Sequence, residues 1–184
     1  MARRAVTGVL LVGGASRRFG SPKALARLGD ETLAQRAWRI LGEACDERIA
    51  VGKAADGLKL PFPLLDDAAD ARAPIAGVVA GLRAAATDVA VFLPVDTPLV
   101  TPELLRELAD ACADAAVPQT GPLPGAYAKT ALPVLERRLR EGQLALKDAL
   151  AELETVTLTL DERLLANVNR PQDLSAMAGG LTRV

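Results

Sequence analysis

The fold of this chain is decided near its start, in the stretch Val9-Leu-Leu-Val-Gly13-Gly14-Ala-Ser16-Arg17-Arg18-Phe-Gly20-Ser-Pro-Lys23. A short apolar run that ends at glycine is typical of a buried strand that leads into a loop. Glycine lets backbone N–H groups approach an anion closely, and Arg17, Arg18 and Lys23 add positive charge. We therefore expect the loop to bind the phosphates of a nucleotide, because α/β folds commonly place them there.

This loop matches neither of two familiar phosphate-binding motifs. Lys23 lies three residues after Gly20 and is not followed by serine or threonine, as it would be in a Walker A loop. The glycine spacing also differs from that of the dinucleotide-binding fingerprint. A plain glycine turn with solvated charges is the alternative. We expect instead that backbone amides hold the phosphates while Arg18 and Lys23 neutralise their charge.

Length and composition indicate one globular domain spanning residues 1–184, with 50% hydrophobic and 24% charged residues. The net charge of −1 argues against a general surface for nucleic acid or for a membrane. The first apolar run, residues 5–12, is too short for a signal peptide or a membrane span. We expect a cytoplasmic protein.

Cysteine and histidine content excludes several kinds of catalysis. Cys45 and Cys112 form no metal-binding motif, and we expect both to be buried free thiols inside amphipathic helices. The chain contains no histidine. Ser-His-Asp and Cys-His mechanisms and histidine-bound zinc are therefore excluded.

Apolar periodicity predicts strands that alternate with helices along the chain. The predicted strands are residues 5–12, 48–51, 61–65, 89–95, 115–118, 123–128 and 155–160. Helices are predicted over residues 32–45, after Pro74, after Thr101-Pro102, from Leu132, over 144–150 and over 171–177. The alternation predicts a Rossmann-like, three-layer α/β/α fold with a mostly parallel sheet. A hairpin-like region around residues 118–128 could add an antiparallel element.

Acidic residues follow two of the predicted strands. Asp96 ends the most apolar one, where a buried unpaired carboxylate would cost on the order of several kcal/mol. Because carboxyl ends of strands carry ligand sites in α/β folds, we expect Asp96 to bind Mg²⁺ together with phosphate oxygens. The alternative is a turn or helix-capping aspartate. Asp66 or Asp67 could accept hydrogen bonds from a base or sugar, or could simply be solvated.

A polar segment near the C-terminus, Asn167-Val-Asn169-Arg170-Pro-Gln-Asp173, is typical of an asparagine turn that caps a helix. The amides of Asn167 and Asn169 could also face a polar ligand.

Taken in order, these segments resemble the molybdenum cofactor guanylyltransferase family of nucleotidyltransferases. The family pattern Leu-Ala-Gly-Gly-x-Ser-x-Arg-x-Gly-x-x-Lys is similar to residues 11–23, and Pro-Val-Asp-Thr-Pro is intact at 94–98. Further family segments resemble residues 73–77, 123–127, 132–136 and 167–174. The resemblance thus extends over nearly the whole chain.

The sequence departs from the family pattern at a few positions. Val12 replaces alanine, Ala73 replaces glycine and Arg170 replaces threonine. The family's asparagine after the second strand has no clear counterpart, because Gly52 or Lys53 occupies that place.

The resemblance implies transfer of GMP from GTP to a molybdopterin-type cofactor, with Mg²⁺ and release of pyrophosphate. It implies nucleotide contacts from Leu11, Val12, Gly13, Gly14, Ser16, Lys23, Asp67 and Asp96. Arg18, Lys23 and Asp96 would be catalytic, Asp96 would also bind the metal, and Asn167 and Asn169 would lie toward the pterin. Transient contact with cofactor-biosynthesis proteins or apo-molybdoenzymes is implied as well.

There are two alternatives, one of them within the nucleotidyltransferases and one in another functional class. One is a cytidylyltransferase, or another nucleotidyltransferase that acts on a phosphorylated acceptor. Gly13-Gly14 and Asp96-Thr97-Pro98 favour guanine, since cytidine-using relatives resemble Leu-Ala-Ala-Gly and Gly-Asp-Met-Pro instead. The other is a non-catalytic nucleotide-binding protein, against which the intact Lys23 and Asp96 argue.

Overall fold

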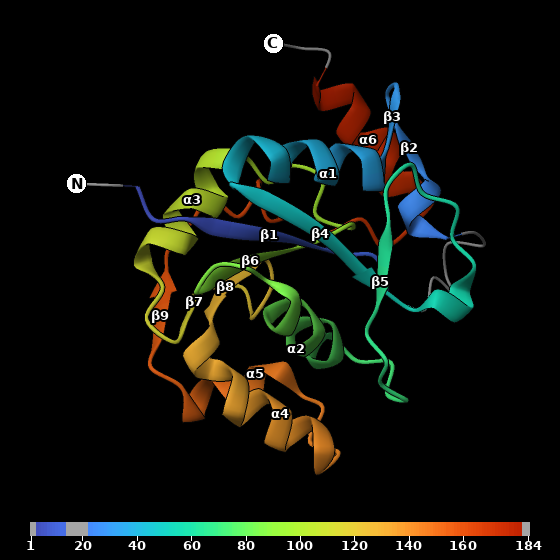
Figure 1. The fold of residues 1–184 in the computed structure, drawn as a ribbon. Coiled ribbons are helices and arrows are strands. Elements are labelled where there is room, and N and C mark those ends of the chain that lie inside the picture. The colour runs from blue at the N-terminus through green and yellow to red at the C-terminus, as the bar shows by residue number, and fades with distance from the viewer. Residues whose placement is uncertain (1–2, 14–21, 182–184) are drawn as a thin grey trace.

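A central sheet of seven strands organises the molecule (Figure 1). The computed structural model describes residues 3–13 and 22–181. The strands pair in the order β5-β4-β1-β6-β8-β7-β9. They are β1 (Val6–Leu11), β4 (Glu47–Gly52), β5 (Leu64–Asp66), β6 (Val89–Pro94), β7 (Ala115–Pro118), β8 (Gly125–Ala128) and β9 (Thr155–Leu158).

Strand directions confirm the predicted mixed sheet. β1 pairs in parallel with β4 and β6, β4 with β5, and β7 with β9. β8 runs antiparallel to both of its neighbours, β6 and β7. The hairpin-like region around residues 118–128 therefore does supply the antiparallel element.

Helices cover both faces of the sheet, as the α/β/α prediction requires (Figure 1). One face carries α1 (Leu33–Ala44), α3 (Pro102–Ala111) and α6 (Pro171–Leu181), and the other carries α2 (Pro74–Ala84), α4 (Leu132–Arg140) and α5 (Leu146–Ala149). Side chains of β1 alternate between them: Val6 and Leu10 join the core under α1 and α3, while Val9 and Leu11 join the core over α2. Burial of both faces explains why the inner strands are continuous apolar runs.

Helix starts follow the signals in the sequence. Thr32 caps α1 in a capping box, in which its hydroxyl accepts from the Gln35 amide and the Gln35 side chain accepts from the Thr32 amide. The Thr101 hydroxyl accepts from the Leu104 amide at 3.3 Å and caps α3, whose first residue is Pro102. Both predicted residues at the start of α3 are thus confirmed.

Several predicted boundaries were wrong. The predicted strand 61–65 forms pairs only from Leu64 to Asp66, and the predicted helix 144–150 is shortened to α5 followed by a 3₁₀ turn, Leu150–Glu152. A hairpin of β2 (Arg27–Leu28) and β3 (Glu31–Thr32) was missed, because two-residue strands are too short to show alternation.

Cys45 and Cys112 each lie just after a helix, α1 and α3 respectively, and not inside it as predicted. Both are free thiols; Cys112 is buried and Cys45 is partly exposed. Among residues 3–13 and 22–181, none of the helices is long and apolar enough to span a membrane.

Both thiols are expected to react slowly in the folded protein. Burial raises the pKa of Cys45 to about 12 and that of Cys112 to about 11, so little reactive thiolate exists at pH 8. With a disulfide reagent at pH 8, we expect labelling to be about a hundredfold faster in denaturant than in the folded protein. Equal labelling rates in the two conditions would contradict the burial of these residues.

Candidate functional site

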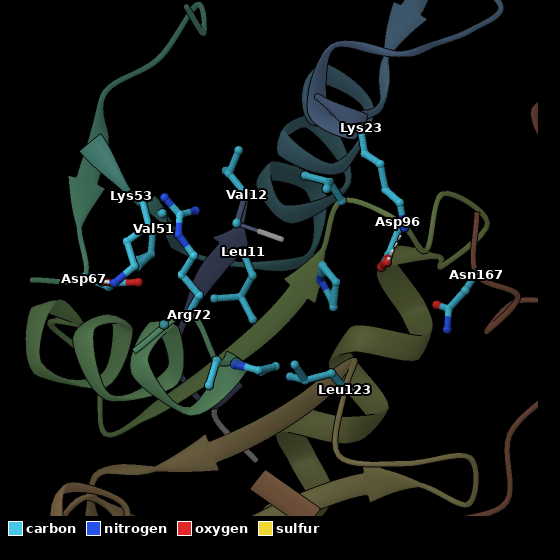
Figure 2. Close-up of a pocket in the computed structure, with 17 residues that line it drawn as sticks. Leu11, Val12, Lys23, Val51, Lys53, Asp67, Arg72, Asp96, Leu123 and Asn167 are labelled. Atoms are coloured by element: carbon cyan, nitrogen blue, oxygen red, sulfur yellow. Dashed lines mark hydrogen bonds and ion pairs between the residues drawn. The ribbon is translucent and has the colours of Figure 1, made fainter. Parts of the chain in front are cut away.

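A cavity of about 380 Å³ opens at the carboxyl ends of β4, β1 and β6 (Figure 2). The size falls in the range of small-molecule sites. Seven predicted site residues line it: Leu11, Val12, Gly13, Lys23, Asp67, Asp96 and Asn167. Gly14, Ser16, Arg17 and Arg18 lie outside the described residues.

Strand register brings these residues together. Leu11 lies opposite Val51 of β4 on one side and Pro94 of β6 on the other. The amide of Val12 donates to the Val51 carbonyl at 2.9 Å, and the amide of Val95 donates to the Leu11 carbonyl at 3.2 Å. The chain segments that leave the three strands therefore start side by side, which places the turn that carries Asp96 close to the end of β1.

Lys23 and Asp96 meet at one end of the cavity (Figure 2). The Lys23 ammonium lies 3.4 Å from Oδ2 of Asp96 and also donates to Oδ1 of Asn169 at 3.4 Å. The side chains of Lys23 and Asp96 are 20% and 29% exposed, respectively, so this pair is accessible to a ligand. Lys23, Asp96 and Asn169, which are far apart in the sequence, thus come together around one positive and one negative charge.

Asp96 does not cap a helix, because Thr101 caps α3. Backbone contacts hold its turn: the Val168 amide donates to the Asp96 carbonyl at 2.7 Å, and Nε of Arg36 donates to the Pro98 carbonyl at 2.8 Å. The carboxylate itself is left to face Lys23 and the cavity. This arrangement favours a binding role over a purely structural turn.

The polar segment near the C-terminus forms a turn at the start of α6. Asp173 Oδ2 accepts from the amides of Asn169 and Arg170, both at 2.8 Å, at the start of α6. These two hydrogen bonds and the nearby Lys23 hold the pKa of Asp173 below its usual value. Asp173 therefore fixes the turn, while Asn167 lines the cavity and Asn169 contacts Lys23.

Lys53 and Asp67 lie at the other end of the cavity (Figure 2). The Lys53 ammonium donates to Oδ1 of Asp67 at 2.6 Å and also to the carbonyl of Ala69. Asp66, in contrast, is exposed and accepts from the amide of Ala68 at 3.1 Å. Of the two aspartates left open by the sequence, Asp67 is the one that lines the cavity.

Sequence reasoning missed Lys53 and Arg72 as cavity residues. Lys53 directly follows β4, so the rule that pointed to Asp96 at the end of β6 could have found it. Arg72 lies in the segment before α2 and pairs with Asp56 at 2.8 Å; this contact raises the pKa of the guanidinium. No sequence pattern marks Arg72.

The charges of the cavity suit a polyphosphate with a divalent cation. Its described lining includes three cations, Lys23, Lys53 and Arg72, and two carboxylates, Asp67 and Asp96. No cluster of three or more His, Cys, Asp or Glu residues that could hold a metal is present among the described residues. Mg²⁺ often takes one or two carboxylates plus phosphate oxygens, and Asp96 fits that pattern.

Comparisons with known proteins identify the family of this chain. The family model described as MobA-like NTP transferase domain matches residues 8–156. A protein of Opitutus terrae is described as a probable molybdenum cofactor guanylyltransferase. It is 37% identical to this chain over an alignment of 188 residues, which covers 92% of this chain and 93% of that protein.

Solved structures show the same fold. Molybdopterin-guanine dinucleotide biosynthesis protein A from Archaeoglobus fulgidus matches with a TM-score of 0.82 and 26% identity, over 97% of this chain and 100% of that one. The 2-C-methyl-D-erythritol 4-phosphate cytidylyltransferase of Thermus thermophilus matches with a TM-score of 0.72 over 96% and 98% of the two chains. Its 20% identity supports a shared fold alone.

The family model that matches residues 8–156 and the 37% identity to a relative over 92% of this chain lead to one assignment. This chain belongs to the MobA-like NTP transferase family.

Proposed function

We propose that this protein transfers GMP from GTP to the terminal phosphate of a molybdopterin-type cofactor and releases pyrophosphate. The observation that carries the proposal is the meeting of Lys23 and Asp96, 3.4 Å apart, at the cavity end of the central strands. The choice of a guanine nucleotide and the molybdenum cofactor as substrates follows from the names of the relatives reported above. A cytoplasmic location and transient contact with apo-molybdoenzymes rest on the family resemblance.

The proposed chemistry fits a chain without histidine. An oxygen of the acceptor phosphate attacks the α-phosphorus of GTP, a P–O bond forms, and the bond to the β-phosphate breaks. The attacking phosphate is already ionised near neutral pH, so no general base is needed.

Catalysis then depends on position and charge. The ammonium of Lys23 would donate to phosphate oxygens, with Asp96 and Asn169 already holding it at the cavity. Asp96 would hold the metal ion, which when bound would neutralise charge on the phosphates. Leu11, Val12 and Gly13, with Gly14, Ser16 and Arg18 beyond the described residues, would complete the nucleotide site.

The reaction is tested by an assay for pyrophosphate release with each of the four NTPs, with and without molybdopterin and Mg²⁺. We expect release with GTP when molybdopterin and Mg²⁺ are both present. A site built on hydrogen bonds to one base can reject another by orders of magnitude. Equal turnover of CTP and GTP would contradict the guanine assignment, and GTP binding without pyrophosphate release would indicate a non-catalytic protein.

Lys23→Ala is expected to lower turnover by about a hundredfold or more, because a well-placed donor to developing charge contributes that much. The measurement is kcat in the same assay, with thermal unfolding as a check on folding. Lys59→Ala, which removes an exposed lysine that does not line the cavity, is the control and should retain wild-type turnover. Near-wild-type turnover of Lys23→Ala would reject the assigned role.

Asp96→Ala is expected to abolish Mg²⁺-dependent activity, because it removes the carboxylate that lines this end of the cavity and would hold the metal ion. The measurement is pyrophosphate release across a titration of Mg²⁺. The matched control is Asp66→Ala, on the exposed neighbour of Asp67. An unchanged Mg²⁺ dependence in Asp96→Ala would show that the metal is held elsewhere.

A further inference from the structure

Arg36 links the turn that carries Asp96 to helix α1, and the chemistry proposed above gives this arginine no part. Its Nε atom donates to the carbonyl of Pro98 at 2.8 Å, two residues after Asp96. The Arg36 side chain is only 20% exposed, and Pro98 is buried. The hydrogen bond is thus largely shielded from water, which strengthens it, and it holds the backbone of the turn against α1.

The stability of α1 does not explain an arginine at this position. Arg36 is the fourth residue of the helix, which begins at Leu33. The first turn of a helix carries partial positive charge, so a cation there does not favour the helix. The carboxylate of Glu31 lies 3.8 Å from Arg36, and it is held by two shorter hydrogen bonds from Arg39, at 2.9 and 3.1 Å. The short contact of Arg36 is therefore with the turn and not with a carboxylate.

The beginning of α1 also holds the segment that carries Lys23. This segment is a 3₁₀ turn, Lys23–Leu25, followed by Ala26, whose carbonyl accepts from the Leu33 amide at 2.8 Å. The Leu33 amide is one of the N–H groups that a helix leaves without a partner at its start. Leu33 and Arg36 are three residues apart, so they are neighbours on the helix. The start of α1 is thus attached to the backbone on both sides of the Lys23–Asp96 pair.

Other hydrogen bonds attach the Asp96 turn to other elements. The Thr97 hydroxyl donates to the carbonyl of Pro94 at 3.0 Å, which ties the turn to the end of β6. The Val168 amide donates to the Asp96 carbonyl at 2.7 Å, which ties it to the segment before α6. Arg36 supplies the attachment to the helix that holds the Lys23 segment.

We propose that Arg36 is a positioning residue: through the carbonyl of Pro98 it holds the Asp96 carboxylate in the place, relative to Lys23, that the phosphates and the metal ion require. The described lining of the cavity does not include Arg36, so it acts through the turn and not by touching the substrate. This inference rests on the proposed function, and it adds a residue outside the cavity that sets the geometry within it.

The demands of the metal explain why the turn needs this attachment. Mg²⁺ requires nearly ideal octahedral geometry, so a carboxylate that shifts its position becomes a poorer ligand. Asp96 lies in a turn and points toward Lys23, with its side chain partly exposed (Figure 2). Groups that are fixed before a ligand binds lose less freedom on binding. Loss of the Arg36 hydrogen bond should therefore weaken the part of GTP binding that depends on Mg²⁺.

Two variants with side chains of similar length separate this hydrogen bond from the charge of Arg36. Arg36→Gln keeps an N–H donor the same number of bonds from the backbone as Nε, and Arg36→Met has none; both remove the charge, and both residues favour helices. Calorimetric titration with GTP, in Mg²⁺ and in EDTA, measures the gain in affinity that the metal provides. We expect Arg36→Met to lower this gain about tenfold and Arg36→Gln to keep it.

Two further variants serve as controls. Arg39→Met removes an arginine of the same helix whose described contacts are with Glu31 and Glu43, and it should keep the wild-type gain. In an Asp96→Ala background, Arg36→Met should cause no further change, because Arg36 acts through Asp96.

The ratio of the two affinities separates positioning from general damage to the site. If Arg36→Met loses affinity equally in Mg²⁺ and in EDTA, or if Arg36→Gln loses as much of the gain as Arg36→Met, the positioning role is wrong and the proposed function stands. If the affinity of the wild-type protein for GTP does not depend on Mg²⁺, the metal role of Asp96 in the proposed function fails, and this inference fails with it.

Discussion

Parallel pairing of β1 with β4 and β6 is the constraint on which the rest of the structure depends. Because parallel strands end at a common edge, the register of Leu11 with Val51 and Pro94 makes three chain segments leave the sheet together. Lys53 and Asp96 lie just beyond that edge, on chain segments that are distant from each other in the sequence. A slip of one residue would reverse the faces of the strand side chains and move both charged groups.

Glycines on α2 let the helix approach the sheet closely enough to form a cavity wall. A Cβ atom at Gly81 would lie 2.6 Å from Cε1 of Phe92, and one at Gly77 would lie 2.8 Å from Cδ2 of Leu11. Larger residues would displace α2 from the sheet or, at Gly77, push Leu11 into the cavity. The lack of a side chain at Gly77 therefore leaves room for Leu11 at the wall of the cavity.

The sequence predicted what depends on local pattern and missed what depends on tertiary pairing. Apolar runs indicated the inner strands, and the position of Asp96 after such a run pointed to the cavity. The partner of Asp67 could not be inferred, because Lys53 reaches it through the pairing of β4 with β5. Asp173 is a different case, because it accepts from amides only three and four residues before it, a local contact that the pattern at the start of a helix could have indicated.

The two ion pairs of the cavity differ in exposure and in rigidity. Lys23 and Asp96 are 3.4 Å apart and more exposed, so a phosphate oxygen or a cation can replace one partner without a large cost. Lys53 and Asp67 are 2.6 Å apart, nearly enclosed and tied to the backbone. Fixed groups lose more when a ligand leaves them unpaired, whereas exposed groups can pair with water instead. One cavity thus combines a more exposed, adaptable ion pair with an enclosed and rigid one.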